Sequence, residues 1–186
     1  MKAVRLFPKL VIVVGIVFAM AGLITSGTGI YIQAFVTQQL AAQNITTPKD
    51  ASIPNALVNS IPTALSMANI IQFHAGTFSG GLTYAQMGRF AVEGGDPAGT
   101  SNPDEALKDA NGKPVANAAR STQETAAGLV TALSLAAMAI GASYGAIALG
   151  VAFLLLGIVI AGLGYALLGL ITPAVAERFG LRPITP

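Results

Sequence analysis

The sequence predicts an all-α membrane protein, in which two long transmembrane helices extend into a small helical extracytoplasmic domain. Two long uncharged segments and a strongly apolar composition lead to this fold class. The segments Leu10–Ala42 and Ala126–Ile171 contain no Asp, Glu, Lys, Arg or His. Because a bilayer core requires about 20 consecutive apolar residues as helix, each segment is long enough to cross a membrane.

The composition agrees with this class. Hydrophobic residues make up 53% of the chain and charged residues 10%, and the mean hydropathy is +0.67. Soluble domains carry about 25% charged residues. The formal net charge of +2, without a cluster of Lys and Arg, argues against a nucleic-acid partner. The chain has no cysteine, which excludes disulfides and thiolate ligands. Membrane lipids are therefore the first partners we expect.

The pattern of apolar and polar residues divides the chain into five segments. We expect a cytoplasmic N-terminus (1–9), a first transmembrane helix with an outer extension (10–43), an extracytoplasmic domain (44–121), an outer helix that continues into the second transmembrane helix (122–172), and a cytoplasmic tail (173–186).

The charges beside the two apolar segments predict the orientation. Lys2, Arg5 and Lys9 precede the first segment, and Arg178 and Arg182 follow the second. Positive residues close to membrane ends favour the cytoplasmic side. We therefore expect a multi-pass protein of the cell membrane with two crossings, both termini in the cytoplasm and residues 44–121 outside.

Two other topologies are open. A division of the second segment near Gly141–Gly145 would give three crossings, but would place the two basic ends on opposite sides. Alternatively, Leu10–Phe18 could be the apolar region of a signal peptide that is cleaved after Ala19–Ala21. The apolar sequence continues well beyond that cleavage site, which favours retention of the segment as a membrane helix.

Both apolar segments are longer than the bilayer requires. A helix over residues 8–43 would measure about 50 Å and one over 122–171 about 75 Å, whereas the hydrocarbon core is about 30 Å thick. Their more polar portions, 26–43 and 122–142, adjoin the middle of the chain. We expect these portions to continue outside the lipid as a stalk, and Pro173 to end the second helix.

The middle of the chain predicts two short helices and a loop. Residues Pro62–Phe73 carry apolar side chains at helical spacing behind a first-turn proline, and Gly76 and Gly80–Gly81 should end this helix. Residues Thr83–Phe90 predict a second short helix with Thr83 as its cap. Residues 94–117 are rich in Gly, Pro, Asn and Asp, and predict an exposed, flexible loop.

Glycines in the long helices are candidates for helix packing, because a missing side chain lets a neighbouring backbone approach closely. Ordinary membrane-helix composition accounts for them equally well. The candidates are Gly22, Gly27, Gly29, Gly141, Gly145, Gly157, Gly162 and Gly164.

His74 is the only histidine, and two roles are open to it. An imidazole can carry protons near neutral pH. A structural role, in which a hydrogen bond to backbone ties the predicted helix 62–73 to the stalk, is favoured because a lone histidine lacks the partners of a metal or acid–base site. We predict no catalytic residue, no metal site and no cofactor.

Short motifs along the chain resemble those of a family of small actinobacterial two-helix membrane proteins. The motifs are Gly29–Tyr31, Val36–Thr46, Asp50–Ala51, Ala68–His74 and Thr83–Met87. Members of that family are often labelled aromatic-ring-opening dioxygenases. A non-haem iron oxygenase needs two histidines and a carboxylate, so the single histidine argues against that activity here.

The resemblance also implies a partner, because proteins similar to this family are accessory subunits of the actinobacterial cytochrome bcc–aa3 respiratory supercomplex. Our leading hypothesis is therefore a non-catalytic accessory subunit, which stabilises a larger membrane complex through helix packing and its extracytoplasmic domain. The alternative is a stand-alone envelope protein that binds a lipid or a hydrophobic small molecule in a cavity between Ile61–Phe73 and the stalk.

Overall fold

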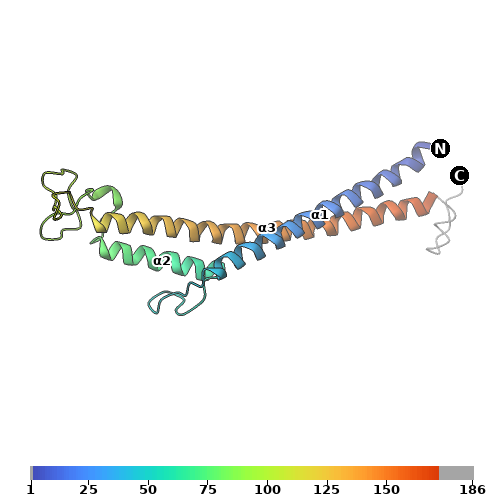
Figure 1. Cartoon of the computed structure of the whole chain (residues 1–186). Helices are drawn as coiled ribbons and strands as arrows, with labels where there is room; N and C mark the ends of the chain where they lie inside the picture. The colour runs from blue at the N-terminus through green and yellow to red at the C-terminus, as the bar shows by residue number, and fades with distance from the viewer. Residues whose placement is uncertain (1, 172–186) are drawn as a thin grey trace. The chain divides into compact units, whose positions relative to one another are not determined.

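A computed structural model describes residues 2–171 as helices joined by loops. The elements are α1 (Lys2–Ala42), α2 (Ile61–Phe78), the 3₁₀ helix η1 (Tyr84–Gln86) and α3 (Ala118–Ile171) (Figure 1). Within residues 2–171 only isolated β-bridges occur and no strand forms. The predicted all-helical class is confirmed for this part of the chain. The predicted tail 173–186, with Pro173, lies outside the described residues.

The chain divides into two compact units. We call residues 2–34 and 141–171 the helix-pair unit, because it holds the N-terminal part of α1 and the C-terminal part of α3. We call residues 35–140 the three-helix unit, because it holds the end of α1, all of α2 and the beginning of α3.

Both α1 and α3 are long and apolar enough to cross a membrane, over Leu6–Ala42 and Ala118–Leu170. Helix α1 begins at Lys2 and therefore includes most of the segment expected as a separate N-terminus; Pro8 lies within it. Helix α3 runs through Gly141–Gly145 without interruption. The described structure thus does not divide this segment into two spans, as the three-crossing alternative requires.

Helix α2 is five residues longer than predicted at its C-terminal end. Its start follows the expected pattern: Pro62 lies in the first turn, and the backbone N–H of Ser60 donates to the hydroxyl of Thr63 at 3.1 Å. The predicted end at Gly76 is wrong, because one helical glycine costs only about 1 kcal/mol. The helix ends where Gly80 and Gly81 adopt positive φ angles of 63° and 82°.

The predicted helix Thr83–Phe90 is also wrong in extent, since only the single 3₁₀ turn η1 forms. Thr83 begins this turn, and its backbone N–H donates to Gln86 Oε1 at 2.9 Å. The chain then extends, and Gly88 and Phe90 donate backbone hydrogen bonds to Ala98 and Thr100 at 2.7 and 2.9 Å. A side chain at Gly88 would collide with the backbone of Thr100, which explains the glycine there.

The three-helix unit has a small core made chiefly of short side chains. Ala64 and Ala68 of α2 pack with Leu133 and Ala137 of α3, and Val58 from the preceding loop completes the cluster. Partly buried side chains surround it, one of them from the end of α1: Leu40, Ile61, Met67, Ile71 and Val130. Short side chains let α2 lie close beside α3 (Figure 1).

Candidate functional site

The helix-pair unit is organised by small residues that recur every seven positions. In α1 the buried positions are Pro8, Gly15, Gly22 and Gly29, and in α3 they include Ser143, Gly150, Gly157 and Gly164. Seven residues are close to two turns of an α-helix, so each set lies along one face. The two faces meet and form what we call the glycine seam.

Backbone meets backbone along the glycine seam. A Cβ atom on Gly15 would overlap the backbone of Gly157 and Ala161, and one on Gly22 that of Gly150 and Leu154. The same overlap would occur from the other helix, where Gly150, Gly157 and Gly164 face the backbone of α1. Any side chain at these positions would force the helices apart.

The eight predicted packing glycines fall into two groups. Gly22, Gly29, Gly157 and Gly164 lie in the seam, whereas Gly27, Gly145 and Gly162 have no atom within 4 Å of an added Cβ, and Gly141 is exposed.

Sequence reasoning missed Gly15 and Gly150, which are also seam positions. The seven-residue spacing of Gly15, Gly22 and Gly29, repeated in Gly150, Gly157 and Gly164, is the signal that could have found them.

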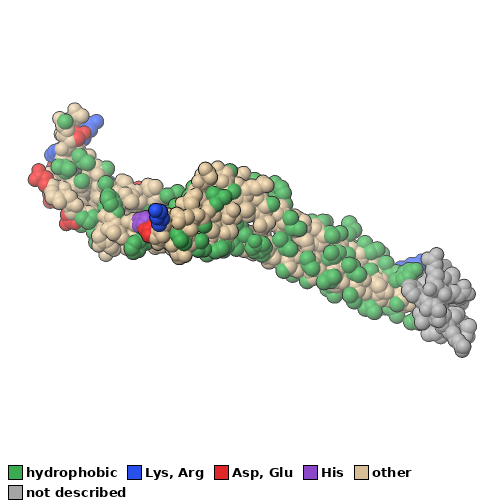
Figure 2. Space-filling model, turned by 90° about the horizontal axis from the view of Figure 1, so that it is seen from below, with side chains coloured by type: hydrophobic (Ala, Val, Ile, Leu, Met, Phe, Trp, Pro, Cys, Tyr) green, Lys and Arg blue, Asp and Glu red, His purple; other side chains and the backbone are tan. Residues whose placement is uncertain are grey.

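Large apolar side chains cover the outside of the helix pair. In the apolar windows of α1 and α3 only 11% of residues are buried. Met20, Ile24, Leu155 and Val159 are among those that are more than half exposed. Figure 2 shows hydrophobic side chains over the visible face of this unit. Such an extended apolar surface is typical of a protein that contacts a membrane or another protein.

A second row of small residues lies on α3, opposite the glycine seam. Gly141, Gly145, Ala148 and Ala152 are all exposed, and at 100° per residue they share one narrow face. We call them the open face. The open face does not pack against α1, so a further helix could approach α3 there as closely as α1 does on the seam side.

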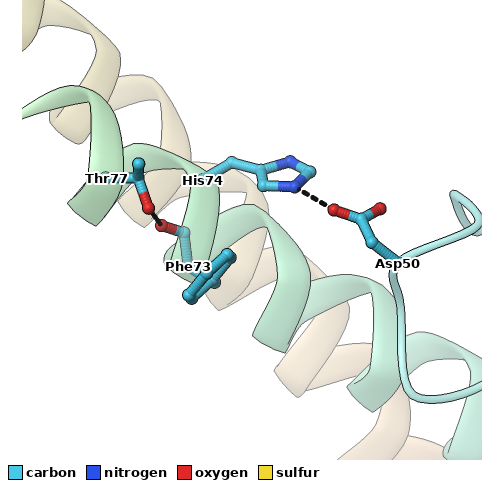
Figure 3. A network of polar contacts seen from close by, with 4 residues as sticks. All are labelled: Asp50, Phe73, His74 and Thr77. Carbon is cyan, nitrogen blue, oxygen red and sulfur yellow. Dashed lines mark hydrogen bonds and ion pairs between the residues drawn. The ribbon is translucent and has the colours of Figure 1, made fainter.

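In the three-helix unit, His74 of α2 contacts Asp50 in the loop before that helix. His74 Nε2 lies 2.6 Å from Asp50 Oδ2, and their side chains point toward one another (Figure 3). The hydrogen bond from His74 lowers the pKa of the Asp50 carboxyl below its ordinary value, and a backbone hydrogen bond adds to the effect. His74 thus bonds to a carboxylate and ties α2 to this loop, instead of bonding to backbone and the stalk.

The loop that carries Asp50 is also held by buried hydroxyls. Ser66 of α2 accepts hydrogen bonds from Ser52 Oγ at 2.9 Å and from the backbone N–H of Ile53 at 3.0 Å. Thr47, which is 1% exposed, accepts from the backbone N–H of Ala56 at 2.9 Å. The position of Asp50 therefore does not depend on His74 alone.

An open groove of about 600 Å³ lies beside His74, between α2 and α3 of the three-helix unit. Its floor holds the buried residues Ala75 and Ala126, and hydroxyls from one turn of α3 form part of its rim. The residues that line it are Ile71, His74, Ala75, Phe78, Ser121, Thr122, Thr125, Ala126 and Leu129. The groove overlaps only the end of the predicted cavity region Ile61–Phe73.

The chemistry open to the described residues is limited. Across residues 2–171, no three His, Cys, Asp or Glu side chains lie close enough together to hold a metal ion. The Asp50–His74 pair is solvent-exposed, with side-chain exposures of 57% and 52%. Exposure keeps both groups hydrated, and so does not prepare them for proton transfer as burial would.

Comparison of the chain with protein-family models, with curated proteins and with solved structures finds no match.

Proposed function

We propose that this chain is an integral membrane protein that serves as a non-catalytic accessory subunit of a larger membrane complex. In this proposal α1 and α3 anchor it in the bilayer, and residues 44–121 form an extracytoplasmic domain. The basic residues that flank the apolar segments support cytoplasmic termini by the charge rule. The resemblance described above suggests the respiratory cytochrome bcc–aa3 supercomplex as the partner.

The open face of α3 is the observation that carries the accessory role. Helices in lipid gain little from hydrophobic burial, so they associate where small residues allow close packing. The glycine seam already serves this purpose within the chain. The open face offers the same surface chemistry and is not used by α1, which is what docking on a partner helix requires.

Replacing Gly145 by Leu tests this role. The side chain would project from the open face, where nothing lies within 4 Å, so the chain should still fold. Affinity purification of the tagged chain in mild detergent should recover haem-containing membrane subunits with the wild type. The Gly145→Leu variant should lose them.

Gly27→Leu is the matched control, because Gly27 is equally open but lies on α1. It should retain the co-purifying subunits. Recovery of the wild-type chain alone, without other membrane proteins, would contradict the accessory role. Equal loss in both variants would contradict docking on the open face.

The groove beside His74 favours a second candidate function, the binding of a lipid or hydrophobic small molecule. Ligand sites are usually apolar concavities with a few polar groups, and a volume of about 600 Å³ is within the usual range. Native mass spectrometry would then detect a bound small molecule. Thr125→Phe, on the groove wall, should reduce its occupancy, whereas Ala132→Phe, at an exposed helix position outside the groove, should not.

A further inference from the structure

The apolar segments of α1 and α3 are longer than a bilayer is thick, so their length alone does not say which residues lie in lipid. The register of the helix pair supplies the missing constraint. Gly15 faces the stretch between Gly157 and Ala161, and Gly29 faces that between Ser143 and Ile147. The two helices therefore run antiparallel, and each step along α1 corresponds to one step back along α3.

This register brings the exposed tyrosines of the two helices to matching levels. Gly29 faces position 145, midway between Ser143 and Ile147, so Tyr31, two residues further on, lies level with position 143 and next to the level of Tyr144. Tyr31 is 69% and Tyr144 53% exposed. Two exposed tyrosines from different helices thus form one belt, which we call the first belt.

A second belt lies at the other end of the pair. Gly164 faces the stretch between Pro8 and Ile12, so Tyr165 lies level with Lys9. Tyr165 is 38% exposed, and Lys9 is exposed as well. Tyrosine at the headgroup level and lysine reaching toward water are both typical of a membrane boundary.

The distance between the two belts matches the thickness of a bilayer. On α1 the step from Lys9 to Tyr31 is 22 residues, and on α3 the step from Tyr144 to Tyr165 is 21. At 1.5 Å per residue these steps span about 33 and 32 Å. The hydrocarbon core is about 30 Å thick.

We propose that the hydrocarbon core of the bilayer covers Lys9–Tyr31 of α1 and Tyr144–Tyr165 of α3, with the two belts at its boundaries. The placement rests on the membrane-spanning character proposed above. Polar residues support it, because Gln33, Gln38 and Gln39 all follow Tyr31. Between the belts, the Ser26 hydroxyl donates to the Gly22 carbonyl at 2.9 Å within α1, which satisfies its donor without water.

The rival placement moves the slab by about three helical turns toward the middle of the chain. It would cover the exposed side chains of Leu135 and Met138. It would also bury the exposed amides of Gln38 and Gln39 in hydrocarbon, where each unsatisfied polar group costs several kcal/mol. The placement between the belts avoids that cost, and so the bilayer should leave the whole stretch Ile32–Ser143 on one side.

The chain contains no tryptophan and no cysteine, so single substitutions can report depth without further engineering. The full chain with Met20→Trp, Leu155→Trp, Tyr31→Trp or Tyr144→Trp is reconstituted into phosphatidylcholine–phosphatidylglycerol vesicles. The phosphatidylcholine is brominated either near the headgroup or near the chain terminus. All four positions are exposed, so folding should be preserved.

Tryptophan at positions 20 and 155 should be quenched more by lipid brominated near the chain terminus. Tryptophan at 31 and 144 should show the opposite order, and to the same extent as each other. Deepest quenching at position 31 or 144 would overturn the placement in favour of the shifted slab. Absence of quenching at all four positions would instead overturn the membrane-spanning proposal itself.

Thiol labelling gives an independent measurement. In the same vesicles, Gln38→Cys should react with a water-soluble maleimide once the vesicles are made permeable, and Val17→Cys should not. Val17 is 58% exposed in the chain itself, so only lipid would protect it. Protection at position 38 would contradict the proposed boundary.

Discussion

The two units of this chain both pack helices through small residues, but different forces complete the packing. In the three-helix unit, alanines at the contact are joined by Val58 and Leu133 and by buried polar groups such as Ser66 and Asn117. In the helix-pair unit, glycines bring backbone against backbone and most large apolar side chains face outward. The first unit gains from burying apolar surface away from water. In the second, close backbone contact and the edge-to-face pair Phe18–Phe153 hold the helices together, and packing through small residues is typical of helices in lipid.

The sharpest way to test this comparison is to place a side chain in the glycine seam. Gly157→Leu would push a Cβ into the backbone of Ala19. Overpacking costs about 1–3 kcal/mol and occasionally more, and we expect a collision with backbone to lie at the upper end. We expect the helix pair to separate at a much lower SDS fraction than the wild type. Energy transfer between dyes on Lys9→Cys and Tyr165→Cys, which lie level with one another, measures the separation during SDS titration.

Gly162→Leu provides the matched control. It lies on the same helix five residues away, and an added Cβ there meets nothing within 4 Å. Its free energy of unfolding in the SDS titration should stay within about 0.5 kcal/mol of the wild type, as for most surface substitutions. Equal destabilisation by both variants would show that the seam does not hold the pair together.

The same contrast explains which features the sequence could predict. The uncharged segments predicted both long helices, because a charge-free apolar run of that length is typical of a membrane helix. Which glycines pack could not be predicted from composition. Gly27 and Gly29 are only two residues apart, yet about 200° of rotation separates them. The seven-residue spacing from Gly22 distinguishes Gly29 from Gly27 in the sequence, and the register with α3 buries Gly29 and leaves Gly27 open.

The Asp50–His74 pair was beyond prediction for another reason. The two residues are 24 positions apart. Hydrogen bonds to the side chains of Thr47 and Ser66 hold the loop that carries Asp50, and such bonds leave no periodic pattern in the sequence. The end of α2 could not be predicted either. The helix continues through Gly76 and ends only before Gly80 and Gly81, which adopt positive φ angles.

Asn117 tests how far the three-helix unit depends on buried polar groups. Its side-chain amide donates to the carbonyls of Gly88 and Pro97 at 3.1 and 2.9 Å, and its oxygen accepts from the N–H of Ala119 at 3.0 Å. Asn117→Ala would remove the cap of α3 and leave two carbonyls without this donor, at a cost of about 2–4 kcal/mol. Faster amide hydrogen exchange in residues 88–117 would measure the loss.

Asn111→Ala is the control for that experiment, since Asn111 is exposed in the same loop. It should leave hydrogen exchange at Phe90 and Ala91 unchanged. If amide hydrogen exchange in residues 88–117 were equally fast in both variants, the order of this loop would not depend on Asn117.

A smaller effect is expected at Ser66, which is 3% exposed. Ser66→Ala would remove the acceptor of the Ser52 hydroxyl and of the Ile53 N–H. The loss of one such partly buried hydrogen bond costs about 0.5–1.5 kcal/mol. Thermal unfolding of the three-helix unit, monitored by amide hydrogen exchange at Val58, should shift to a lower temperature. Ser101→Ala, at an exposed position, should cause no shift, and a shift of the same size there would remove the basis for this prediction.

The smallest effect should come from the Asp50–His74 pair, because it is exposed and screened by water. The pKa of Asp50 is lowered in the folded chain. Its contribution to stability is therefore complete above the pKa of the unfolded chain, and is lost as the pH falls through the lower folded value.

His74→Ala removes the main cause of the lowering, so the pKa of Asp50 should rise, as a carboxyl-detected NMR titration would measure. Thr77→Val, whose hydroxyl bonds only to Phe73 (Figure 3), should leave that pKa in place. An unchanged titration in His74→Ala would mean that the hydrogen bond does not persist in solution.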